Sequence, residues 1–191
     1  VWDSEGVRYE EPKLKIMGIE AIKTSTPAPC RKFLKDAFTL LMSGTEDEVI
    51  DYIEECRTQF NKLPPEEVAF PRSVSNVEKW KSSSDMYNKG CPIHVRGAIL
   101  YNHWTVKKKI DHKYATINNG EKIKFCYLKT PNWMHENVIS FIQDFPRELD
   151  LDKYIDYELQ FNKSFMEPIK AILDCIGWET ERKNTLESFF S

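Results

Sequence analysis

The sequence is poor in the residues and patterns that several classes of protein require. Its 191 residues include only seven glycines, which excludes collagen-like and glycine-rich repetitive chains. No run of about 18 apolar residues occurs, so no segment has the length and character of a transmembrane helix. The first residues lack the pattern of a secretory signal. The chain begins with Val1, and we expect it to be part of a longer protein.

The five cysteines do not form a disulfide pattern. They are odd in number and scattered along the chain, with no Cys-x-x-Cys pair, which favours free thiols in a reducing compartment. Cys91 and His94, followed by His103 and His112, are residue types that bind metals. Their spacing differs from the standard zinc patterns, so we expect no metal site and no cofactor in this chain.

Catalytic motifs are also absent from the sequence. It contains neither of the glycine-rich phosphate loops, GxxxxGK and GxGxxG. No pair of acids follows an apolar strand to hold two metal ions, and no serine has the context of a nucleophile elbow. We therefore expect no catalytic residue here, and a small independent enzyme is the least favoured function.

The pattern of apolar residues predicts a mostly helical α+β domain. Apolar residues recur every three or four positions after Pro27, after Thr45, after Pro92 and from Leu151 to Ile176. Thr45 and Glu48 form a capping box, and Pro168 is expected to kink or restart the last helix. The expected core comprises Phe33, Leu34, Phe38, Leu41, Ile53, Phe60, Leu100, Trp104, Leu159, Phe165 and Ile169.

Two segments have the character of strands. Residues 1–24 read as extended, and Lys13 and Lys15 alternate with apolar residues, so the two lysines share one face. Asn119-Gly120 predicts a hairpin turn within a small antiparallel sheet at residues 114–141. The expected organisation is an extended segment at 1–24, a main domain at 25–178 and a tail at 179–191.

Charge is distributed unevenly along the chain. Eight acids against two bases give residues 46–67 a charge of −6, and eleven acids against six bases give residues 144–187 a charge of −5. Between these segments, nine bases against three acids give residues 72–113 a charge of +6. The positive middle permits a polyanion to dock on one face, although chance clustering on a solvated surface gives the same pattern.

Two short segments carry candidate binding residues. Ser73, Ser75 and Asn76 lie at an expected helix start, where hydroxyls and free N–H groups suit a phosphate oxygen; the alternative is a surface helix capped by Ser75 and Glu78. The tail TLESFFS carries three large apolar side chains. These side chains either dock on a partner or fold back on their own domain.

The sequence resembles a known family at several points. VWDSEGVRYEEPKLKIMGIEAIKTSTP resembles the end of the palm domain, and its connection to the thumb, in family B DNA polymerases of T-even-type bacteriophages. CPIHVRGAILYN, the Phe165-x-x-Pro168 pattern and the apolar tail match in the same order, and PRSVSNVEKW lies where these enzymes have a serine-rich segment that contacts phosphates.

The resemblance implies roles for these residues. Lys13 and Lys15 would lie beside the primer terminus, and Leu186, Phe189 and Phe190 would bind the sliding clamp. The catalytic aspartates and their Mg²⁺ ions would belong to the remainder of the polymerase, which is an expected partner in the cytoplasm of the infected bacterium. The residues expected to grip the duplex backbone are Arg72, Ser73, Ser75, Asn76, Lys79, Lys89, His94 and Arg96.

The expected function is therefore duplex DNA binding by the thumb of a replicative polymerase, with attachment to the clamp through the tail. A free-standing adaptor that binds a clamp or another protein, without a DNA role, remains the alternative.

Overall fold

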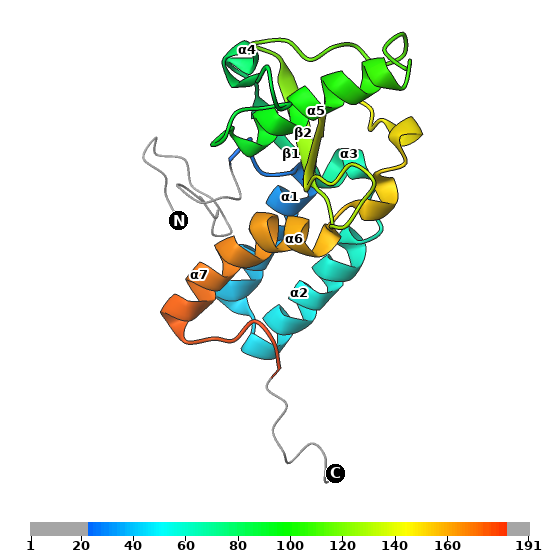
Figure 1. Ribbon diagram of the computed structural model, residues 1–191. Coiled ribbons are helices and arrows are strands. Elements are labelled where there is room, and N and C mark those ends of the chain that lie inside the picture. Colours follow the sequence, from blue (N-terminus) through cyan, green and yellow to red (C-terminus); the bar gives the residue numbers. More distant parts are fainter. Residues whose placement is uncertain (1–22, 183–191) are drawn as a thin grey trace, which may run out of the picture.

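A computed structural model describes residues 23–182, in which a helical part packs against a part built around a small sheet (Figure 1). The predicted α+β class is confirmed. The helical part comprises α1 (Ala28–Ser43), α2 (Glu46–Phe60), α6 (Tyr157–Phe161), the π-helical turn η4 (Asn162–Met166) and α7 (Glu167–Ile176). The sheet part comprises α3 (Pro65–Val68), β1 (Phe70–Ser73), α4 (Val77–Trp80), α5 (Ile93–Lys107), β2 (Lys122–Tyr127), β3 (Val138–Phe141) and the 3₁₀ turns η2 (Arg147–Leu149) and η3 (Asp152–Tyr154).

The first two helices form the antiparallel pair expected from the sequence. Thr45 caps α2 by accepting a hydrogen bond from the Glu48 N–H, and the Glu48 carboxylate accepts one from the Thr45 N–H at 2.7 Å, so the capping box is confirmed. Aromatic rings fill the space between these helices and the later ones. Phe161 stacks on Phe165 with ring centres 5.0 Å apart, and Phe165 meets Phe33 edge to face.

The last helix is interrupted near Pro168, as predicted. Proline has no N–H to donate, and its ring crowds the carbonyl four residues earlier, here that of Ser164. The chain accommodates this with the wide π turn η4 between α6 and α7. The predicted start at Leu151 is wrong, because the side chain of Asp156 accepts the Leu159 N–H and begins the helix at Tyr157.

The sheet has the antiparallel order β1-β2-β3, so β2 is its central strand. The hairpin predicted at Asn119-Gly120 is wrong, because β2 pairs with Phe70–Ser73, some 50 residues earlier, and not with the residues just before the turn. The Gly120 N–H donates to the Val74 carbonyl at 2.8 Å, and Gly120 has the positive φ of +86° that the turn requires.

Helix α5 packs directly on β3. A Cβ atom on Gly97 would lie 2.4 Å from the Ser140 hydroxyl oxygen and 2.9 Å from the Ser140 nitrogen, so only glycine allows this approach. The Ser140 hydroxyl donates to the His94 carbonyl at 2.8 Å. This contact fixes the first turn of α5, which carries His94 and Arg96, against the sheet.

Eight of the eleven predicted core residues are buried, whereas Leu41, Trp104 and Leu159 are only partly buried. A buried glutamine that the sequence did not identify joins the two parts of the molecule. The Gln160 amide accepts the Tyr127 N–H from β2 at 2.9 Å and donates to the Val68 carbonyl at 2.7 Å.

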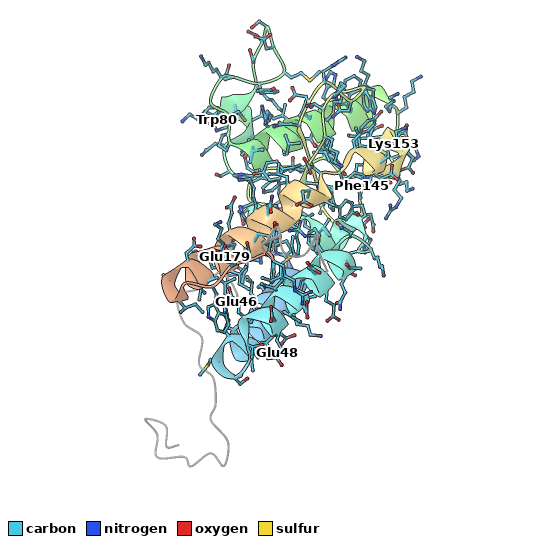
Figure 2. The ribbon with its side chains drawn as sticks, turned by 90° about the horizontal axis from the view of Figure 1, so that it is seen from below. Glu46, Glu48, Trp80, Phe145, Lys153 and Glu179 are labelled. Carbon is cyan, nitrogen blue, oxygen red and sulfur yellow. The ribbon has the colours of Figure 1, made fainter. Side chains whose placement is uncertain are left out.

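The acids of α2 and the predicted duplex-binding cations belong to different parts of the molecule (Figure 2). Glu46 and Glu48 belong to the helical part, and Trp80 lies at the outer end of the sheet part. The sheet part carries the predicted duplex-binding cations of the described region, which are Arg72, Lys79, Lys89 and Arg96.

Candidate nucleic-acid interface

The polar segment after β1 presents its hydroxyls to solvent. Ser73, Ser75 and Asn76 are exposed, whereas Val74 and the following Val77 are buried and hold the segment in place. The predicted cap by Ser75 is wrong: Asn76 precedes α4 in the left-handed region, with φ of 58°. The Val77 N–H instead donates to the Asn119 side chain at 2.8 Å, which leaves the Ser75 hydroxyl without a capping role.

The loop between α4 and α5 brings Lys79 and Lys89 together. The Asn88 N–H donates to the Trp80 carbonyl at 2.8 Å, and its side-chain amide donates to the Lys79 carbonyl at 3.2 Å. Both lysines are exposed, and the Lys79 ammonium lies over the Trp80 ring at 5.4 Å. Two cations ten residues apart in sequence are therefore presented by neighbouring backbone segments.

Arg96 joins the same region from the first turn of α5. Its guanidinium lies 5.5 Å from the centre of the Tyr87 ring and donates to the side chain of Asn137. The Arg96 Nε is buried and has no hydrogen-bond partner among residues 23–182. We call Lys79, Lys89 and Arg96 the outer cluster.

Arg72 and His94 lie deeper, around the ring of Phe125. The Arg72 guanidinium lies 5.6 Å from the centre of that ring, and the His94 ring is 6.4 Å from it. Arg72 also donates to the carbonyl of Ser25 at 2.7 Å, so it ties the backbone before α1 to β1. This contact gives Arg72 a positioning role that sequence reasoning did not foresee, and contact with DNA remains a prediction for it.

Lys122 is a candidate that the sequence analysis did not assign. It pairs with Ser73 in the register of β1 and β2, and it lines a pocket of about 460 Å³ together with Arg72 and Ser25. The alternation of lysines after Gly120 was the signal that could have identified it. An exposed lysine beside Ser73 extends the cationic surface to the start of the central strand β2.

The candidate cations are not neutralised by acids of the described region. Within residues 23–182, neither Arg72, Lys122 nor any member of the outer cluster forms an ion pair with a carboxylate. Lys81 and Lys113, by contrast, do form such pairs, with Glu78 and Glu148. The unpaired cations leave a positive surface on which phosphates can replace water.

Part of the predicted site lies outside the described residues. Lys13 and Lys15 precede residue 23, and Leu186, Phe189 and Phe190 follow residue 182. Between residues 23 and 182, no three histidine, cysteine, aspartate or glutamate side chains gather closely enough to hold a metal ion. No helix of this part of the chain is long and apolar enough to cross a bilayer.

The protonation of His94 is shifted by its surroundings. Burial lowers the pKa of its imidazole below the usual 6.5, and the positive charge of Arg72 lowers it further. At neutral pH the ring is therefore uncharged, and it can act as a hydrogen-bond donor but not as a cation.

This shift predicts that stability decreases in acid. Below about pH 6.5 the unfolded chain takes up a proton at His94 more readily than the folded protein does, so protonation favours unfolding. Between about pH 7.5 and pH 5.5, we expect the free energy of unfolding to fall further in the natural chain than in the His94→Gln variant, as measured by urea denaturation. Equal losses in the two proteins would contradict the prediction.

Comparison with known proteins confirms the resemblance to phage polymerases. The whole chain aligns with the DNA-directed DNA polymerase of Escherichia phage RB69, at 31% identity over 195 residues, and with that of Enterobacteria phage T4, at 26% identity over 194 residues. No protein-family model matches the chain. The chain spans 21% of the length of each of these two relatives.

Proposed function

We propose, from the similarity of the whole chain to phage DNA-directed DNA polymerases, that it binds primer–template duplex DNA as the thumb of a family B replicative polymerase. The similarity along the whole of this chain is the observation that carries the proposal. The unpaired cations of the outer cluster and Lys122 support it, because a polymerase must hold duplex of any sequence and release it at each step.

The candidate side chains suit binding to the phosphate backbone of DNA and not recognition of its base sequence. Lysine and serine side chains on short exposed segments can reach phosphate oxygens, which carry no sequence information. Lys13 and Lys15 would extend the grip toward the primer terminus. Leu186, Phe189 and Phe190 would attach the polymerase to its sliding clamp, because three apolar side chains can bury a large surface on a partner.

Salt dependence of duplex binding tests the proposal. With about four phosphates neutralised, the logarithm of the association constant should fall with the logarithm of salt concentration with a slope of roughly −3 to −4. Fluorescence anisotropy with a labelled primer–template duplex, in the presence of the rest of the polymerase, measures it. Deletion of residues 185–191, assigned to the clamp, should leave this affinity unchanged.

A duplex affinity that does not change with salt would overturn the proposal, as would no affinity at any salt concentration. Binding to a clamp without any binding to duplex would favour the adaptor instead. The two functions are therefore separated by one titration and one deletion.

A further inference from the structure

A groove of about 480 Å³ runs between α5 and the loop that follows α4. Its apolar lining includes Ile99, and also Val106 and Met86, which are 58% and 38% exposed. Lys81, His103 and Lys107 line it as well. The groove contains none of the residues assigned above to duplex DNA.

The neutral polar groups of the groove are already used within the protein. The side chain of Asn102 donates to the Ile117 carbonyl at 2.9 Å and accepts the Ile117 N–H at 2.8 Å. The Ser82 hydroxyl accepts the N–H groups of Ser84 and Asp85. What the groove offers to an occupant is therefore apolar surface together with positive charge.

The positive charge is positioned by the fold. The Lys107 ammonium lies 4.5 Å from the centre of the Trp104 ring and forms no ion pair within the described part of the chain. His103 is exposed and packs its ring edge to face on the same tryptophan. The Lys81 ammonium forms an ion pair with the Glu78 carboxylate at 2.6 Å. The Lys107 ammonium is therefore the main positive group available to an anionic ligand.

An acidic protein segment fits this combination better than a nucleic acid does. No Phe, Tyr or Trp lines the groove, and its one ring, that of His103, already packs against Trp104, so the groove offers little surface on which unpaired bases can stack. We propose that the groove binds an acidic amphipathic segment of a partner protein, which inserts large apolar side chains against Val106 and Met86 and places a carboxylate near Lys107. This interaction is independent of the proposed binding of duplex.

A labelled peptide tests the proposal directly. The probe is a fluorescein-labelled helical peptide of about 14 residues, with leucine and phenylalanine on one face and glutamate on the other, and its binding to the full chain is measured by anisotropy. We expect Val106→Glu and Lys107→Glu each to weaken binding roughly tenfold or more. Met42→Glu, a matched change at a side chain that is 70% exposed on α1, should have no effect.

Three results would overturn the proposal. One is equal affinity for a peptide whose leucines and phenylalanines are replaced by alanine, since charge alone would then explain binding. Another is competition with the peptide by a single-stranded oligonucleotide whose own binding is weakened by Val106→Glu. The third is loss of duplex affinity in Val106→Glu, which would assign the groove to the DNA site. Circular dichroism verifies that each variant is folded.

Discussion

Replacing Lys79, Lys89 and Lys122 together by glutamine is expected to reduce duplex affinity by about two to three orders of magnitude at 0.1 M salt. Each phosphate contact contributes about 0.9 to the salt slope, which corresponds to roughly eightfold in affinity at that concentration. The slope itself should become shallower by about 2.7. All three side chains are exposed, so the fold should tolerate the change.

A matched variant distinguishes the effect of where the lysines lie from the effect of the protein's net charge. Replacement of Lys32, Lys35 and Lys170 by glutamine removes the same charge from exposed positions on α1 and α7, in the helical part. We expect this variant to keep most of the affinity and nearly the full salt slope. Equal losses in the two triple variants, measured by anisotropy across a salt series, would show that overall charge and not the proposed interface determines binding.

Replacing Gln160 by leucine is expected to cost about 2–6 kcal/mol of folding free energy. The substitution conserves approximate size but removes the partners of the Tyr127 N–H and the Val68 carbonyl. Each group left buried without a hydrogen bond costs roughly 1–3 kcal/mol. Because the folded state of a domain is favoured by only about 5–15 kcal/mol, this change removes a large share of its stability.

Urea denaturation measures this loss, with Gln59→Leu as its control. Gln59 is exposed on α2, and its side chain donates to Glu55 one turn earlier in the same helix, so its replacement should change stability by less than about 0.5 kcal/mol. A Gln160→Leu variant as stable as the control would mean that water or a rearranged backbone satisfies both groups.

Local signals predicted the helices more successfully than the sheet. The capping box at Thr45 and the interruption at Pro168 depend on residues a few positions apart, so a single sequence contains them completely. The pairing of β1 with β2 joins residues some 50 positions apart. A turn motif such as Asn119-Gly120 cannot reveal that a distant strand competes successfully for the same edge.

The candidate site was predicted by residue type but not by role. The family resemblance named Lys79, Lys89 and Arg96, and the fold brings them together through the loop after α4. The sequence alone could not show that the Arg72 side chain donates a hydrogen bond to the Ser25 carbonyl, because that contact depends on the path of the backbone before α1. Lys122 was missed because its closeness to Ser73 arises only from strand register.

The separation of the acidic α2 from the cations of the sheet part affects how the molecule approaches a charged partner, before the two make contact. The acids on α2 and the cations of the outer cluster, carried by different parts of the molecule, give the described region an electric dipole. In the field of a polyanion such a dipole turns, so encounters begin with the outer cluster leading. Added salt shortens the range of this orienting torque, and it should slow association more than it speeds dissociation.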